Sequence, residues 1–160
     1  TLQRFGTHLT LKTWRQVLAT LIPHHASKRL TDEKELNTLL ADWSAPGNTG
    51  ASGQVSNYAA AMRLPEAASI SLEQLRWSYL STSKINGRKH MVLTRREIKA
   101  TVWAVRGERD PLLPARAWRK DLEFARGNYR FIEVPAAGHF VQEEQPELMT
   151  NLILEFLNKL

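Results

Sequence analysis

Residues Ala100–Val141 have the sequence ATVWAVRGERDPLLPARAWRKDLEFARGNYRFIEVPAAGHFV, and this stretch decides the fold. It contains two short apolar runs, Thr101–Val105 and Tyr129–Val134, which are rich in β-branched and aromatic residues and predict two strands. Between them, Pro114–Ala125 has the pattern of a helix with proline in its first turn. A strand, a crossover helix and a strand of this length predict a right-handed parallel βαβ unit.

Each predicted strand ends at a glycine-containing turn that carries a titratable residue. Asp110 follows the first strand, within Gly107–Pro111, and His139 follows the second, within Pro135–Phe140. The carboxyl ends of parallel strands meet at one edge of a sheet, and this edge is where ligands bind in open α/β sheets. We therefore expect Asp110 and His139 to form a hydrogen-bonded acid–imidazole pair.

The order and flanks of this pair resemble the C-terminal part of the α/β-hydrolase fold, whose chain order is nucleophile, acid, histidine. Gly107–Pro111 resembles the acid turn of that family, Gly138–Phe140 resembles its histidine turn, and Pro146–Leu157 resembles its closing helix. The resemblance implies that Asp110 orients His139, and that His139 is the base that activates a nucleophile or a water molecule.

The nucleophile of the family lies on a strand-to-helix elbow ahead of the cap, and no segment of this sequence matches that elbow. Gly50–Gln54 has the first glycine and the serine of G-x-S-x-G, but it lacks the last glycine and follows a loop. Asp42–Trp43 resembles the Asp-Trp of epoxide-hydrolase elbows, but it lies within a helical pattern. We therefore expect the chain to contribute the acid and the histidine only, and whether the nucleophile is Ser or Asp stays open.

Residues 1–97 are predicted to be helices and loops, and residues 98–160 are predicted to be the α/β part. The resemblance implies that the first part is a helical cap, which covers the active site in epoxide-hydrolase-like members. Leu72–Trp77 is similar to the last cap helix of those members. Their cap tyrosines protonate the epoxide oxygen, whereas the register here puts Leu75 or Ser78 at one such position. This departure weakens epoxide hydrolysis specifically and leaves other hydrolase chemistry open.

Three aromatic residues are candidates for substrate binding. Phe140 follows the histidine, Trp77 lies in the last predicted cap helix, and Tyr58 lies in the helix before it. A tyrosine in such a helix is more often a packing or rim residue, so both interpretations of Tyr58 stay open. Trp103 and Trp118 fit core positions of the first strand and its crossover helix.

Apolar residues recur at helical spacing in the first part of the chain. They predict helices at Leu9–Leu21, at Asp32–Trp43, at Gln54–Arg63 and at Glu66–Leu80. In the second of these helices, Glu35 stands three residues after Asp32, as in a capping box. The pair His24–His25 is expected in a turn or on the surface, since no third metal ligand is evident. No metal and no cofactor is predicted.

The composition is that of one soluble domain: 160 residues, 42% hydrophobic, with no cysteine. No apolar run is long enough for a membrane span, and we expect a cytoplasmic protein. The chain starts with Thr1, which suggests trimming, processing or a fragment. The net charge is +6, and the densest basic cluster is Lys84–Arg96. Its neighbours are aliphatic and not aromatic, so we expect a solvated connecting segment there and no nucleic-acid site.

Two functions follow from these observations. In the first, the chain is part of a hydrolase that acts on a small molecule by ester, epoxide or halide hydrolysis, completed by an N-terminal half. In the second, it is an inactive hydrolase fragment that binds a partner or itself, because two strands with open edges recruit another chain. Whether the isolated chain is an enzyme, and on which substrate, stays open.

Overall fold

The computed structural model describes residues 23–80, 84–94, 96–115, 118, 120–125 and 127–159. The helix predicted at Leu9–Leu21 lies outside these residues. The described elements, in chain order, are α3 (Pro23–Thr31), α4 (Glu33–Trp43), the 3-10 helix η2 (Ser52–Gln54), α5 (Val55–Met62), α6 (Ala67–Leu80), α7 (Ile85–Thr94), β1 (Val102–Gly107), the 3-10 helix η4 (Lys120–Glu123), β2 (Tyr129–Val134), α9 (Val141–Glu144) and α10 (Pro146–Leu157).

The two predicted strands pair in parallel, as expected. Val102 stands opposite Tyr129 and Gly107 opposite Val134, and the described part of the chain contains this two-stranded sheet. Because the strands are in register to their last residues, both carboxyl ends stop at the same level of the sheet. The two turns with Asp110 and His139 therefore leave the sheet side by side.

The predicted crossover helix is shorter than Pro114–Ala125. Ala115 and Trp118 are helical and η4 follows, while residues 116, 117 and 119 lie outside the described part. The predicted end of the helix is wrong, because Ala125 forms an isolated parallel bridge with Ile98. The Ile98 amide donates to the Phe124 carbonyl at 2.7 Å, so strand pairing begins before the helical pattern of the sequence has ended.

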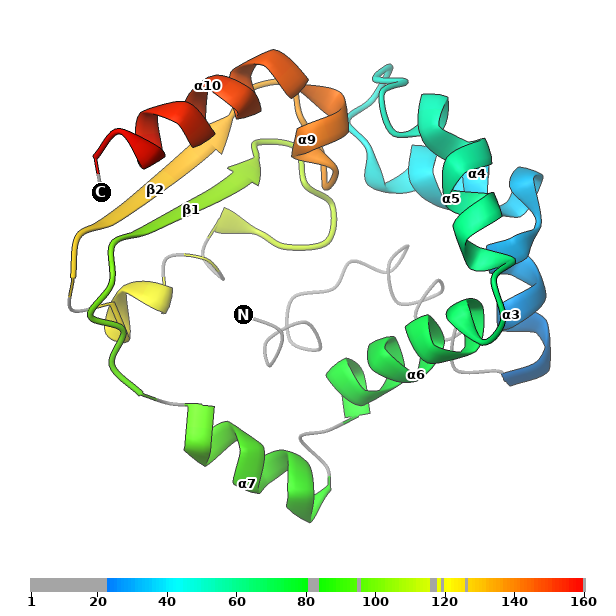
Figure 1. The fold of residues 1–160 in the computed structure, drawn as a ribbon, viewed down its shortest axis with the longest axis horizontal. Helices are drawn as coiled ribbons and strands as arrows, with labels where there is room; N and C mark the ends of the chain where they lie inside the picture. Colours follow the sequence, from blue (N-terminus) through cyan, green and yellow to red (C-terminus); the bar gives the residue numbers. More distant parts are fainter. Residues whose placement is uncertain are drawn as a thin grey trace.

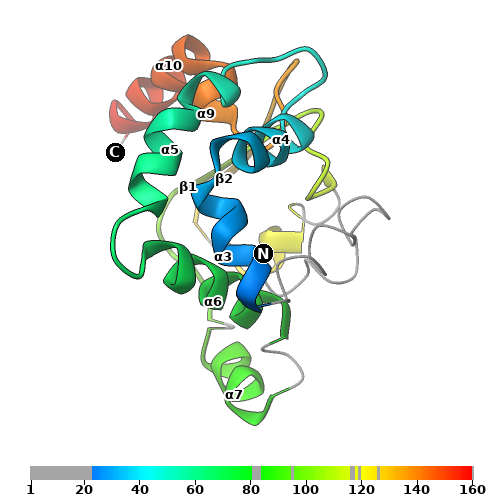
Figure 2. The same ribbon diagram turned by 90° about the vertical axis from the view of Figure 1, so that its right-hand side faces the viewer.

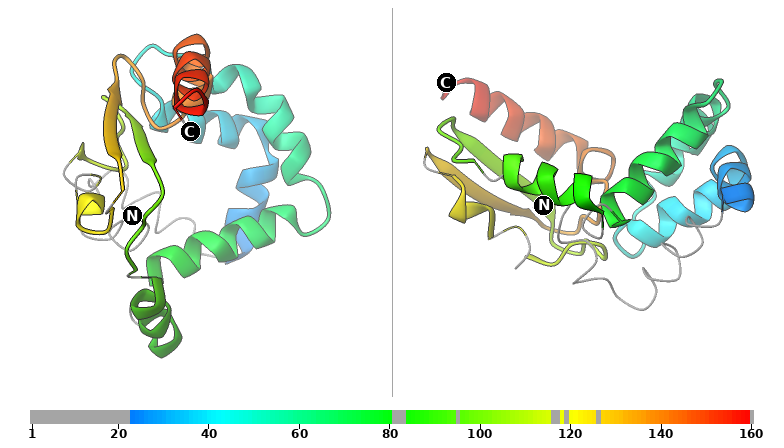
Figure 3. Two further views of the ribbon diagram at one scale, coloured as in Figure 1. Left: turned by 60° about the vertical axis from the view of Figure 1, so that its left-hand side comes forward. Right: turned by 90° about the horizontal axis from the view of Figure 1, so that it is seen from below.

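The closing helix α10 runs back alongside the two strands (Figures 1 and 3). Its Met149 and Leu152 pack against a buried cluster formed by Val134, Ala137 and Val141, with Val105 of β1 beside them. The bounds of α10, Pro146–Leu157, agree with those predicted from the sequence.

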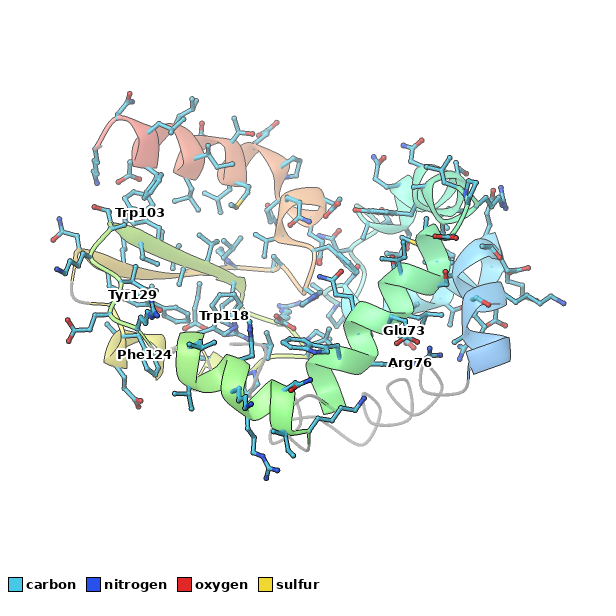
Figure 4. The ribbon with its side chains drawn as sticks, turned by 60° about the horizontal axis from the view of Figure 1, so that its bottom comes forward. Glu73, Arg76, Trp103, Trp118, Phe124 and Tyr129 are labelled. Atoms are coloured by element: carbon cyan, nitrogen blue, oxygen red, sulfur yellow. The ribbon has the colours of Figure 1, made fainter. Side chains whose placement is uncertain are left out.

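Trp103 lies on the side of the strands that faces α10 (Figure 4). Its ring meets Phe156 edge-on at 5.5 Å between centroids. The side chains of Arg130 and Lys159 lie 4.5 and 5.0 Å from the centre of the Trp103 ring. Trp118 packs instead against the buried pair Leu112 and Leu113.

The helical part of the chain is organised around α3, which packs against α4, α5 and α6. The sequence analysis did not predict α3, and it expected His24–His25 in a turn or on the surface. The backbone of this pair is instead helical, since both residues lie in α3. A buried cluster of Leu36, Leu40, Ala51 and Ala59 joins α4 to α5.

Within the basic segment Lys84–Arg96, for which the sequence predicts a connecting segment, Ile85–Thr94 form the helix α7. Figure 2 shows α7 at the end of the molecule opposite α9 and α10. Ile85, Val92 and Leu93 are exposed on it. Within the described residues, every helix is too short or too polar to cross a lipid bilayer.

Candidate active site

The turns that follow β1 and β2 are in direct contact. The Glu108 amide donates to the Val134 carbonyl and the Arg109 amide donates to the Ala137 carbonyl, each at 2.9 Å. A Cβ atom on Gly107 would lie 2.0 Å from the Gly138 carbonyl oxygen, so only glycine permits this approach. The glycine of the first turn therefore brings the second turn within reach of Asp110.

Asp110 and His139 form the predicted pair. The Asp110 Oδ2 atom lies 3.2 Å from His139 Nδ1, and the Asp110 side chain is 3% exposed against 29% for His139. The other carboxylate oxygen, Oδ1, accepts the backbone N–H groups of Leu112 at 2.7 Å and Leu113 at 3.2 Å. These two hydrogen bonds fix the position of the carboxylate beside the imidazole.

This arrangement favours the imidazole tautomer that carries its proton on Nδ1. The Nδ1–H group then donates to Asp110, and the Nε2 lone pair is left to accept a proton from another molecule. No described residue bonds to Nε2 of His139, and the side chain is partly open to solvent. The pair can therefore act as a general base whose cation the buried carboxylate stabilises.

The end of α4 forms a third side of the site. The His139 amide donates to the Trp43 carbonyl at 2.8 Å, and the two rings meet edge-on at 5.7 Å between centroids. A Cβ atom on Gly138 would lie 2.4 Å from the Ala45 amide nitrogen. The histidine turn is thus enclosed between the acid turn and the segment that leaves α4.

No family model matches the sequence, and no curated protein matches it. Among solved structures, a protein assigned as an epoxide hydrolase, from Klebsiella pneumoniae, aligns with a TM-score of 0.70 and 15% identity, over 97% of this chain and 53% of its own. Epoxide hydrolase A from Mycobacterium thermoresistibile aligns with a TM-score of 0.62 and 19% identity, over 89% of this chain and 51% of its own. 2-Hydroxy-6-oxo-6-phenylhexa-2,4-dienoate hydrolase from Rhodococcus aligns with a TM-score of 0.56 and 13% identity, over 87% of this chain and 49% of its own.

The chain has a partial α/β-hydrolase fold. It spans about half the length of each of these structures. At identities below 20% the likeness is one of fold, so the chemistry of the site has to be argued from the residues of this chain.

Within this α/β-hydrolase fold, Phe140 lies at the site. Its ring is 5.4 Å from the His139 ring and is stacked at 6.1 Å on Trp43. The sequence analysis did not select Trp43 as a site residue. In the sequence, Trp43 was marked only by its place in the Asp-Trp pair. The periodicity of apolar residues does not reveal that the end of this helix contacts the histidine turn, which is distant in sequence.

The other two predicted substrate-binding residues differ in their surroundings. Tyr58 packs against the α4–α5 cluster, and its hydroxyl donates to Glu143 in α9. This hydrogen bond, aided by burial and by the negative charge of Glu143, raises the pKa of Tyr58 to about 12. Trp77 has its ring against His90 of α7 at 5.0 Å and is 45% exposed. Both residues remain predicted substrate contacts.

A surface depression of about 470 Å³ lies elsewhere, between α3, α5 and α6. Met62, Pro65 and Ser69 are among the residues that line it, and neither Asp110 nor His139 does. One of the three helices that border the depression, α6, also carries the Glu73–Arg76 ion pair (Figure 4). This depression is therefore separate from the acid–histidine pair.

Neither elbow candidate has the geometry of a nucleophile elbow in the described part of the chain. Ser52 lies in η2, which follows a loop, and Asp42 lies in the last turn of α4. An elbow requires a strand that ends directly at the nucleophile. Within the same described residues, no group of three or more His, Cys, Asp or Glu side chains is placed to hold a metal ion.

Proposed function

We propose that Asp110 and His139 are the acid and the base of a hydrolase triad. The observation that carries this proposal is the 3.2 Å contact between Oδ2 of Asp110 and Nδ1 of His139, at the carboxyl edge of two parallel strands. Contact between an oriented imidazole and a buried carboxylate is the geometry that base catalysis by histidine needs.

The proposed reaction is hydrolysis of a small molecule that contains an ester, an epoxide or a carbon–halogen bond. A Ser or Asp nucleophile attacks the substrate and breaks its ester C–O, epoxide C–O or carbon–halogen bond, so that an alcohol departs, the ring opens or halide departs. Water then hydrolyses the covalent intermediate and frees the nucleophile. Nε2 of His139 accepts a proton from the serine hydroxyl or from the attacking water, and this proton passes to the departing oxygen or to solvent. Asp110 stabilises the imidazolium ion that forms. The hydrolase names of the structural neighbours support this class of reaction.

The nucleophile is proposed to come from polypeptide that is not part of this sequence, either a further part of the same protein or a second chain. Parallel strands are usually buried within larger sheets, which supports a neighbouring strand beside the β1–β2 pair. We infer that such a strand delivers the nucleophile to the edge where His139 lies.

The test is hydrolysis by the protein purified together with every polypeptide that accompanies it. Para-nitrophenyl acetate and styrene oxide are the probes for ester and epoxide hydrolysis. We expect Asp110→Asn to lower kcat by about 10⁴-fold and His139→Gln by about 10⁶-fold, as loss of the corresponding triad members does. Glu147→Gln is the control, because Glu147 is exposed in the first turn of α10.

Two outcomes contradict the proposal. One is wild-type hydrolysis that survives in both His139→Gln and Asp110→Asn. The other is a complete assembly that carries a Ser or Asp elbow and hydrolyses neither probe nor any haloalkane. Intact mass of the purified assembly identifies the polypeptide that carries the elbow.

A second candidate function, a self-associating module without catalysis, is favoured by the surface of α10. Ile153, Leu154 and Leu157 are 49%, 54% and 56% exposed and follow one another at helical spacing. Such a row is typical of a surface that another chain covers. This candidate replaces the first if the isolated chain associates with itself and no assembly hydrolyses the probes.

A further inference from the structure

Glu144 is a buried acidic residue beside the acid–histidine pair. It is 6% exposed and ends α9. Acidic residues just before Pro146 are typical of a helix N-terminus, so the sequence predicts only a structural role for Glu143 and Glu144. The Glu144 carboxylate instead turns back toward the histidine turn and accepts backbone N–H groups there.

The carboxylate accepts three backbone hydrogen bonds from two segments of the chain. Its Oε2 atom accepts the amides of Ala45 and Gly138, each at 2.8 Å. Its Oε1 atom accepts the amide of Phe140 at 3.0 Å. An ionised carboxylate in a buried place needs such donors to offset the loss of hydration, and charge-assisted bonds of this kind are strong.

The donors are placed so that they surround His139. Gly138 and Phe140 are its immediate neighbours in the chain, and Ala45 is two residues beyond Trp43, whose carbonyl accepts the His139 amide. One carboxylate thus fixes the backbone on both sides of the histidine and joins it to the end of α4. The Glu144 carbonyl adds a bond at 3.2 Å from the Asn48 side-chain amide.

We propose that Glu144 is a positioning residue that holds the His139 backbone where its ring meets Asp110. The inference rests on the proposed function, and it adds a residue whose carboxylate bonds to the backbone on either side of His139. Glu144 acts through the backbone, whereas Asp110 acts through the ring itself.

Replacing Glu144 by glutamine tests the proposal at nearly constant volume. A carboxamide has a single acceptor oxygen, so its NH₂ group must face at least one of the three N–H donors. With the carbonyl at the place of Oε2, the Phe140 amide loses its acceptor; in the opposite orientation, the Ala45 and Gly138 amides lose theirs. Either orientation loosens the backbone next to His139.

The experiment is NMR on the isotope-labelled chain. Amide hydrogen exchange is measured at Ala45, Gly138 and Phe140, and long-range ¹H–¹⁵N spectra give the tautomer of the His139 ring. In Glu144→Gln we expect exchange at one or more of these amides to rise about tenfold or more, since one lost hydrogen bond changes local opening by about this factor. We also expect the share of the Nδ1–H tautomer to fall. Glu147→Gln, the matched change three residues on, leaves both readouts unchanged.

Each result has a defined meaning. If the wild-type ring is not in the Nδ1–H form, the acid–base proposal fails, whatever Glu144 does. If the wild-type ring is in that form and Glu144→Gln changes neither exchange nor tautomer, the positioning role of Glu144 alone is overturned. If Glu144→Gln does not fold, the wild-type exchange decides: the three amides must exchange more slowly than in an unfolded peptide, and unprotected amides overturn the proposal.

Discussion

Gly138 illustrates at the scale of one residue how tightly the histidine turn is enclosed. A Cβ atom there would lie 2.4 Å from the Ala45 nitrogen and 2.7 Å from the Trp43 carbonyl oxygen. Both are backbone atoms at the end of α4, so neither moves aside as a flexible side chain would. The position therefore admits glycine alone.

Gly138→Ala is predicted to lower the free energy of unfolding by about 1–3 kcal/mol, the usual cost of overpacking a closed site. Urea unfolding followed by circular dichroism measures the change. Gly53→Ala is the control, since a Cβ atom on Gly53 has no neighbour within 4 Å. Equal unfolding midpoints for the two variants would contradict the close contact of Gly138 with the end of α4.

Tyr58 gives a prediction about pH. Its pKa is raised from 10.0 to about 12, first by the hydrogen bond to Glu143. A raised folded-state pKa means that the stabilisation is fully present below pH 10 and is lost as the pH rises from about 10 through 12. Titration of tyrosinate absorbance should therefore reveal one of the three tyrosines ionising near 12.

Tyr58→Phe should remove this late ionisation and leave the remaining tyrosines unchanged. Circular dichroism across the same pH range shows whether the fold persists. A wild-type titration that is complete well below pH 12, in protein that is still folded, contradicts the Tyr58–Glu143 hydrogen bond.

At this scale the sequence predicted the Asp110–His139 pair, because each residue lies at the end of a recognisable strand. It did not predict that Trp43 and Glu144 belong to the same site. Trp43 lies at the site because the end of α4, which is distant in sequence, packs against the histidine turn. Glu144 lies there because its side chain folds back onto the backbone of that turn. Neither event leaves a periodic pattern.

At the scale of elements, the start of α4 forms one half of the capping box that the sequence predicts. Asp32 is the N-cap of α4, and its side chain accepts the Glu35 amide at 3.0 Å. The reciprocal half of a capping box is not formed, because the Glu35 carboxylate pairs with Arg29 and the Asp32 amide donates to Lys28. The cap predicted from the sequence is confirmed in one direction.

Asp32→Ala is therefore predicted to lower the free energy of unfolding by about 0.5–2 kcal/mol through loss of the N-cap. Asp32→Asn, which keeps an acceptor oxygen, should lie close to the wild type. Thermal unfolding of the three proteins provides the comparison, and an alanine variant as stable as the asparagine variant would argue against the cap.

Two described helices, α3 and α7, were not predicted from the sequence, each for its own reason. The segment of α3 has proline ahead of the His24–His25 pair, and proline is compatible with the first turn of a helix. The segment of α7 has aliphatic and basic residues on all sides, so no apolar stripe marked it as a helix. Where one face is clearly apolar, as in α10, the predicted and observed bounds agree.

At the scale of the whole molecule, the boundary proposed between residues 1–97 and 98–160 stays a prediction. The site nevertheless draws on both sides of it, since Trp43 and Ala45 bond to the histidine turn and to Glu144. Apolar side chains of α10, namely Ile153, Leu154 and Leu157, are exposed outside this site.

We accordingly predict that the isolated chain self-associates through this surface. Leu154→Lys, in the middle of the exposed row, should shift the sedimentation coefficient toward that of a monomer and weaken its dependence on concentration. Leu64→Lys is the control, because Leu64 is 63% exposed in the loop before α6. A wild-type chain that stays a compact monomer at high concentration contradicts the prediction.

The central claim is that Asp110 holds His139 as the base of a hydrolase. Its most direct test is the ¹H–¹⁵N spectrum of the His139 ring in the wild-type chain and in Asp110→Asn. The claim predicts an Nδ1–H tautomer in the wild type that is lost in Asp110→Asn, since a neutral amide no longer favours that proton position. A ring that is already protonated on Nε2 in the wild type, or that is unchanged in Asp110→Asn, would contradict it.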